Sequence, residues 1–192
     1  LLMILNFNSE DLMALEKHKR AHFINSLGGF KSVSLVGTSD KEGNSNLAVF
    51  SSIFHIGANP PLIGLIFRPS PPERNTFANI IKTGFYTLNH INETIYNQAH
   101  QTSARYDKGI SEFEITGLNR EYKDGFFAPY VTESNIQLGI EFKEKIIMTI
   151  SEIVRYRNFL YFFSRKLYIS IKECCFYGNM MIIIIMRTIR IR

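Results

Sequence analysis

Hydrophobic and small polar residues alternate along much of this chain, and an alternation with a period of two predicts half-buried β-strands. Residues 32–38 show it first, and the turn-forming residues 39–45 that follow them indicate a β-hairpin. The further strand candidates are residues 46–56, 62–67, 85–90, 135–142 and 145–155. Asn59-Pro60-Pro61 separates the first two of these, and we expect the prolines to prevent regular pairing between them.

Helical spacing of apolar residues is confined to a few segments. They are residues 9–26, 75–83 and 92–101. In the second of them, Phe77, Ile80 and Ile81 form the predicted buried stripe. Six or so strands with so few short helices favour a small barrel over a doubly wound α/β sheet. The pattern therefore predicts a mainly β fold, a small β-barrel with a few short peripheral helices.

Composition fits one globular domain. The 192 residues suffice for one substantial core, and 45% of them are hydrophobic. The net charge of +5 lies in residues 151–192, which carry eight Lys/Arg and two Asp/Glu, so 14 basic and 15 acidic residues, a charge of −1, remain in residues 1–150. Because nucleic-acid binding needs a basic stripe across the folded face, this distribution argues against a nucleic-acid partner.

Residues 151–192 also differ in character from the preceding chain. Ile, Tyr, Phe, Met, Lys and Arg dominate after Arg155, and turn-forming residues nearly disappear. We interpret residues 1–150 as the barrel domain and residues 151–192 as an atypical basic and apolar tail, an incomplete or altered end of the same domain. Our hypothesis for this tail is an altered or shifted reading frame near residue 150.

The cysteines and the apolar segments predict a cytoplasmic protein. The only cysteines, Cys174 and Cys175, are adjacent, and a disulfide between them would be strained and would close no loop. The N-terminal residues do not combine a basic region with an apolar core, so we expect no secretion signal. The longest strongly apolar run, residues 180–186, is far shorter than the roughly 20 residues that span a bilayer, and we expect no membrane association.

Three segments carry a resemblance to a known family. They are residues 46–52 (NLAVFSS), 57–64 (GANPPLIG) and 74–80 (RNTFANI), in this order and spacing. Together they resemble the flavin reductase family, and residues 100–106 and 111–118 are similar to a further stretch of one branch of it. The resemblance covers about residues 25–150. It implies an FMN-binding split β-barrel, flavoredoxin-like, that forms a homodimer with the flavin near the subunit interface.

The resemblance further implies that the first segment wraps the flavin ring and that the third opens a helix near the phosphate. A phosphate needs amides, hydroxyls and a cation, which Arg74, Asn75 and Thr76 offer. From the residues alone, a simple N-cap at Asn75 and a solvated charge at Arg74 are the commoner interpretation. The candidate flavin-binding residues are Ala48, Val49, Phe50, Ser51, Ser52, Arg68, Arg74, Asn75, Thr76, Asn79, His100, Ser103, Ala104 and Arg105.

The sequence offers no catalytic group of its own. His18 and His22 lie four apart on a predicted helix, but no third ligand is evident, so we expect no metal site. Gly-rich dinucleotide and phosphate motifs and a nucleophile elbow are missing too. A flavin carries the redox chemistry itself. We therefore expect an FMN-dependent oxidoreductase, driven by NADH or NADPH, that reduces flavin or another small acceptor. An FMN electron carrier of the flavoredoxin type and a cofactor-free structural barrel remain the alternatives.

Overall fold

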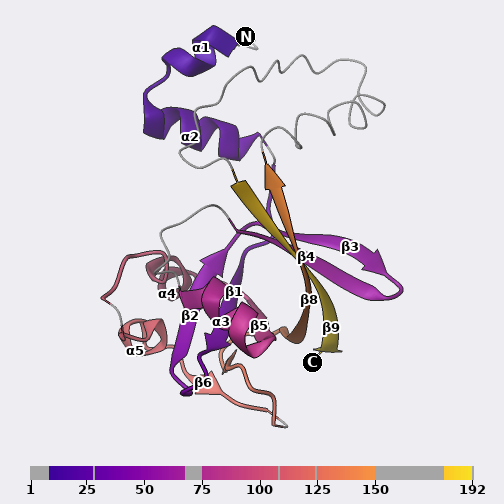
Figure 1. The fold of residues 1–192 in the computed structure, drawn as a ribbon. Coiled ribbons are helices and arrows are strands. Elements are labelled where there is room, and N and C mark those ends of the chain that lie inside the picture. Colours follow the sequence, from indigo (N-terminus) through magenta and orange to yellow (C-terminus); the bar gives the residue numbers. More distant parts are fainter. Residues whose placement is uncertain are drawn as a thin grey trace. The chain divides into compact units, whose positions relative to one another are not determined.

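The computed structural model describes residues 9–27, 29–67, 75–107, 109–123, 125–149 and 180–191; for residues 9, 75, 148–149 and 180–191 it describes the backbone alone. Its contacts divide the chain into two compact units. One unit comprises Leu1–Lys31 and Thr149–Asn179, and the other comprises Ser32–Met148 and Met180–Arg192. The second unit holds the sheet (Figure 1).

The first unit begins with two helices, α1 (Ser9–Ala14) and α2 (Lys17–Ser26). The prediction of one continuous helix over residues 9–26 was wrong. The break follows from Glu16, whose carboxylate caps α2 by accepting the amides of His18 and Lys19 at 3.0 and 3.1 Å. These backbone hydrogen bonds lower the pKa of Glu16. No described helix combines the length and apolar character that a membrane span requires.

The second unit consists mainly of strands, which confirms the predicted fold class. Its strands are β1 (Ser34–Ser39), β2 (Ser45–Phe50), β3 (Ile53–Ala58), β4 (Pro61–Phe67), β5 (Phe85–His90), β6 (Arg120–Glu121), β7 (Tyr130–Val131), β8 (Gln137–Thr149) and β9 (Met180–Ile191). Its helices are α3 (Asn75–Thr83), α4 (Tyr96–Gln101) and α5 (Glu112–Thr116). β6 pairs only with β7 in the described sheets, and the other seven strands form one sheet.

The large sheet curls because its two end strands are consecutive in the sequence. The strand order is β2-β1-β5-β8-β9-β4-β3. Only Ser51 and Ser52 separate β2 at one end from β3 at the other. Since two residues span at most about 7 Å, opposite ends of the sheet must meet at this corner. The result is a barrel whose ends meet at the corner. Beyond the corner β2 and β3 do not pair with each other in the described sheet, so the barrel is open there, which defines a split β-barrel.

Three aromatic rings pack against one another beside this corner. The rings of Phe50, at the end of β2, and Phe67, at the end of β4, lie 5.1 Å apart in an edge-to-face arrangement. The ring of Phe77, in the first turn of α3, lies 5.3 Å from that of Phe67. The corner and the beginning of α3 are therefore neighbours, although about 25 residues separate them in the sequence.

Two apolar clusters lie on opposite sides of β1. Val36 faces the barrel interior, and its neighbour Leu35 faces outward, as the period of a strand requires. The interior cluster comprises Val36, Leu65, Phe67, Ile80, Tyr86, Leu88, Leu138 and Ile140. The outer cluster comprises Leu35, Leu47, Ile95, Ala99, Phe113, Leu118 and Val131. Helix α3 thus packs on the interior side, and α4 and α5 pack on the outer side.

Several strand boundaries differ from those expected. Residues 46–56 are interrupted at the corner instead of forming one strand. β8 joins the predicted strands 135–142 and 145–155 as far as Thr149, and residues 150–155 lie outside the described residues. The prolines do not prevent pairing: β3 and β4 form an antiparallel hairpin, in which Pro61 pairs with Ala58. Pro61 is the first residue of β4, a position at which its missing amide hydrogen is tolerated. The Asn59–Pro60 peptide bond in the turn is cis.

The helix over residues 75–83 was predicted with its correct bounds, but the set of residues predicted to form its buried face was partly wrong. Ile81 is 40% exposed, while Thr76 and Asn79 are buried. The reason is that both polar side chains find partners on the sheet. The predicted helix over residues 92–101 begins later, at Tyr96, because the side-chain oxygen of Asn92 accepts the amide of Thr94 and forms a turn there.

A buried polar network fastens the segment around β7 to β5. Asn89 is fully buried, and its side-chain nitrogen donates to the carbonyl of Leu35 at 3.2 Å and to the hydroxyl of Thr87 at 2.9 Å. Its oxygen accepts the amide of Val131 at 3.0 Å. Thr87 in turn donates to the carbonyl of Pro129. Every polar atom of the Asn89 side chain therefore has a partner inside the protein.

Replacing Asn89 with alanine should destabilise the protein by about 3 kcal/mol, because buried groups lose their partners and a cavity is left. Urea unfolding monitored by circular dichroism measures the loss. Asn97→Ala, at an exposed position of α4, is the matched control and should change the free energy of unfolding by no more than about 0.5 kcal/mol. Equal stabilities of the two variants would contradict this role of Asn89.

Candidate functional site

The outer edge of β2 exposes backbone groups that the sheet does not use. β2 is an end strand and pairs with β1 from Ser45 to Phe50. The amide of Leu47 points away from β1, since it donates to the carboxylate of Glu112 at 3.0 Å. In an antiparallel pair this direction repeats every second residue, so the amide and carbonyl of Val49 also face outward. β2 thus carries a strip of outward-facing polar groups that leads to Ser51.

The two serines of the corner differ in their environment. The hydroxyl of Ser52 donates to the carbonyl of Ile66 at 2.8 Å, and the amide of Ile66 donates to the carbonyl of Ser52 at 3.1 Å. Ser52 therefore fixes the corner to β4. Ser51 is exposed. Of the two hydroxyls, the one on Ser51 is in a position to contact a ligand.

Two side chains of α3 tie this helix to the hairpin β1–β2. Thr76 accepts a hydrogen bond from the side-chain nitrogen of Asn46 at 2.9 Å. Asn79 donates to the hydroxyl of Thr38 at 3.2 Å. All four side chains are buried. Thr76 and Asn79 therefore position α3, whose first turn offers amides with no partner inside the helix beside the corner.

The structure brings together residues 48–52 and the start of α3, and of the candidates beyond residues 48–52 and α3 it describes only His100, Ser103, Ala104 and Arg105. Arg68 and Arg74 lie outside the described residues, as does the side chain of Asn75. His100, Ser103, Ala104 and Arg105 are exposed at the end of α4, where Ser103 donates to the carbonyl of His100 at 2.7 Å. Since α4 contributes to the outer cluster and α3 to the interior cluster, we expect this loop and the start of α3 to lie apart within a single chain.

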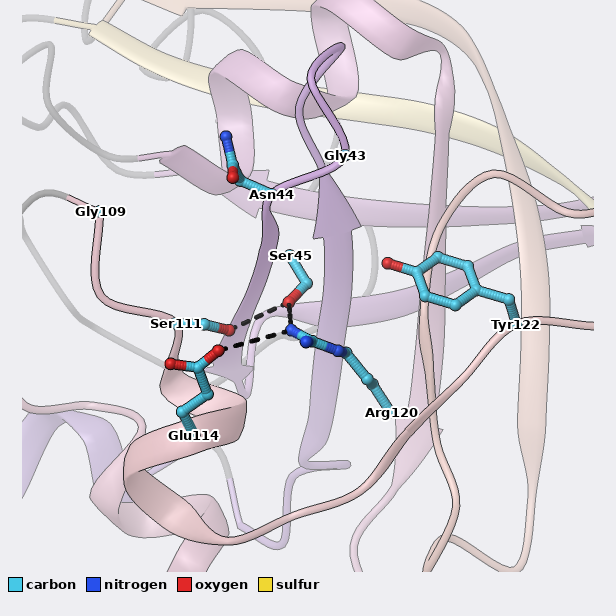
Figure 2. Close-up of a pocket in the computed structure, with 8 residues that line it drawn as sticks. All are labelled: Gly43, Asn44, Ser45, Gly109, Ser111, Glu114, Arg120 and Tyr122. Carbon is cyan, nitrogen blue, oxygen red and sulfur yellow. Dashed lines mark hydrogen bonds and ion pairs between the residues drawn. The ribbon is translucent and has the colours of Figure 1, made fainter.

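A polar pocket of about 340 Å³ opens on the outer side, between the β1–β2 turn, α5 and β6 (Figure 2). In it, Arg120 donates to the hydroxyl of Ser45 at 2.8 Å and lies 3.8 Å from the carboxylate of Glu114. The hydroxyls of Ser45 and Ser111 are 3.1 Å apart. None of the predicted flavin-binding residues whose side chains the structure describes lines the pocket. Because the polar groups of Ser45, Ser111 and Arg120 contact one another, we interpret it as a clamp on the hairpin.

Sequence reasoning missed Glu112 and Arg120. Glu112 lies 65 positions from its partner Leu47, and Arg120 lies 75 positions from its partner Ser45. No local spacing in the sequence therefore relates either residue to β2. The resemblance of residues 111–118 to a branch of a family included Glu112 without assigning it a role, and it did not reach Arg120.

Comparison with known proteins identifies the family. The model of the flavin reductase like domain matches residues 28–158. The chain belongs to this family. Among solved structures, a putative flavin reductase with a split barrel domain from Shewanella frigidimarina NCIMB 400 is 44% identical, with a TM-score of 0.77 over 97% of this chain and 79% of that protein. The search of curated proteins finds no match.

More distant structures share the fold of this flavin reductase-like chain. Nitrilotriacetate monooxygenase component B from Bacillus cereus is 20% identical, with a TM-score of 0.72 over 100% of this chain and 82% of its own. The flavoredoxin of Desulfovibrio vulgaris (Miyazaki F) is 15% identical, with a TM-score of 0.60 over 84% of this chain and 69% of its own. The predicted family and the split barrel are both confirmed, and flavin binding is what the family implies.

Burial raises the pKa of Glu112 above its ordinary value of 4.5, and the hydrogen bond from Leu47 opposes this only in part. A carboxyl group with a raised pKa in the folded state binds its proton more tightly there than in the unfolded chain. Its contribution to stability is therefore full below pH 4.5 and is lost as the pH rises through the folded pKa.

Glu112→Gln removes this ionisation and keeps an acceptor for Leu47. We expect the stability of the wild type relative to the variant to fall as the pH rises from below 4.5 towards neutrality. Urea unfolding of both proteins at a series of pH values measures the difference. A difference that is constant with pH, or that grows as the pH rises, would contradict the raised pKa.

Proposed function

We propose that the chain binds FMN at the corner between β2 and β3 and uses it to pass hydride or electrons from NADH or NADPH to a flavin or another small acceptor. One observation carries the proposal: the rings of Phe50, Phe67 and Phe77 bring the outward-facing edge of β2 and the first turn of α3 to the same place. The family implies a flavin. In this proposal the start of α3 binds the phosphate of FMN, and the edge of β2 binds its ring.

The start of α3 fits the phosphate. The first amides of a helix have no partner within it and carry partial positive charge, which favours an anion. Thr76 and Asn79 hold the helix on the hairpin, and Arg74 and Asn75 directly precede that turn in the sequence. In this proposal Arg68 and Arg74 provide the cations.

The edge of β2 fits the flavin ring. The outward amide and carbonyl of Val49 and the hydroxyl of Ser51 supply donors and acceptors for the polar edge of the ring, and the side chains of Ala48, Val49 and Phe50 supply apolar surface beside it. Ser52 keeps this corner in place through β4.

When bound, FMN supplies the hydride-accepting centre, so the residues of this chain need only bind and orient it and the reductant. No protein acid or base enters the proposal. We expect His100, Ser103, Ala104 and Arg105 to lie apart from the start of α3, so they contribute in this proposal to the site of a second copy in a homodimer.

The proposal is tested by the visible spectrum of the purified protein after addition of FMN, followed by anaerobic mixing with NADH or NADPH. We expect a bound, oxidised flavin that either nucleotide bleaches. Bleaching only after a separate reductase is added would instead show an electron carrier. A protein that takes up no FMN would contradict the proposal.

Ser51→Ala should weaken FMN binding about fivefold, the equivalent of one lost hydrogen bond of about 1 kcal/mol. Fluorescence titration of FMN measures the affinity. Thr132→Ala, which removes an exposed hydroxyl after β7, should leave it unchanged. An unchanged affinity in the Ser51 variant would exclude this hydroxyl as a ligand of the flavin.

A further inference from the structure

We propose that Glu112 is a positioning residue for the flavin: its carboxylate holds the free edge of β2 in the place that the ring uses. The inference rests on the proposed function, since it concerns the same strand. Glu112 itself touches neither the corner nor α3 in this proposal, and it acts through the backbone of β2.

The contact between Glu112 and Leu47 replaces a missing strand. Among the described strands β2 has a neighbour on one side only, so its outward amides lack the ladder that fixes the rest of the sheet. The carboxylate accepts the amide of Leu47 at 3.0 Å. A hydrogen bond to a charged acceptor is stronger than one between neutral groups. The next outward amide along the strand is that of Val49, roughly 7 Å further on.

Helix α5 is anchored well enough to act as a support. Phe113, next to Glu112, is buried in the outer cluster, and the hydroxyl of Thr116 donates to the carbonyl of Glu112. The helix ends at Gly117, whose φ of 70° is a left-handed conformation that glycine adopts without strain. The Glu112 side chain is thus directed at β2 by a packed element.

The side chains of the polar pocket support β2 at Ser45, two residues before Leu47. Arg120 and Ser111 both bind Ser45, the first residue of β2, and Figure 2 shows these side chains converging there. Together with Glu112 they hold β2 at positions 45 and 47, immediately before the segment proposed to face the ring. Glu114 pairs with Arg120 and so belongs to this support, whereas Glu93, at an exposed position before α4, offers a matched control.

The test compares the wild type with Glu112→Ala, Glu112→Gln and the control Glu93→Ala. Hydrogen exchange at the amide of Leu47, followed by NMR, reports on the contact, and fluorescence titration reports on FMN affinity. We expect Glu112→Ala to speed the exchange at Leu47 at least about tenfold and to weaken FMN binding about fivefold, since it removes a hydrogen bond to a charged group. Glu112→Gln keeps a neutral acceptor and should lie between Glu112→Ala and the wild type, and Glu93→Ala should stay close to the wild type.

Several results would overturn the proposal. Faster exchange at Leu47 with unchanged FMN affinity would limit Glu112 to a structural role, and unchanged exchange would show that the contact does not hold the edge. A Gln variant as weak as the Ala variant would exclude the hydrogen bond as the cause. If wild-type protein binds no FMN, the proposed function itself fails. The exchange rate at Leu47 still shows whether the Glu112 contact holds the edge of β2, so the two failures can be distinguished.

If the Ala variant does not fold, Glu112→Asp takes its place, because the shorter side chain withdraws the carboxylate from Leu47. The same two measurements then decide. Weaker FMN binding with faster exchange in the Asp variant supports the positioning role, and wild-type values of FMN affinity contradict it.

Discussion

The direct join between β2 and β3 is the constraint on which the rest of the structure depends. Since Ser51 and Ser52 alone connect the two end strands of a seven-stranded sheet, the sheet has to curl until its ends meet. Curling creates the enclosed interior that Val36, Tyr86 and their neighbours fill. β2 is an end strand of this sheet, so its outer edge has no neighbour among the described strands. The apolar core thus follows from the short connection, and the free edge follows from the place of β2 in the strand order.

The sequence predicted most of the elements whose signals are local. α3 and β5 were found with their correct bounds, because a helical stripe, a left-handed glycine and an alternating strand follow one another without a gap. The errors came where a tertiary contact outweighs local preference. The residues 46–56 look like one strand, and only the pairing of Ser52 with Ile66 shows that the chain changes partner there. Glu16 likewise ends a helical pattern by capping the next helix.

For the candidate site, the sequence predicted which two segments lie close together, and their binding of a flavin stays a prediction. Residues 48–52 and the start of α3 were chosen together, and the aromatic contacts show that they are neighbours. What sequence could not supply is the direction of each side chain. Thr76 and Asn79 carry the polar groups expected of a phosphate site, yet both are buried against the hairpin, where they hold the helix. Glu112 and Arg120 were overlooked because their contacts with β2 join distant parts of the chain.

A free strand edge is normally a liability, because its unpaired amides and carbonyls can pair with another chain. Here the edge is short, one of its amides is covered by a carboxylate, and its first residue is clamped by Arg120. What remains open is the stretch around Val49, next to an exposed hydroxyl and the first turn of a helix. A planar ligand with donors and acceptors along one side can satisfy those groups as a neighbouring strand would. The same backbone that would otherwise invite aggregation is therefore suited to a flavin, provided that side chains outside the barrel keep it in register.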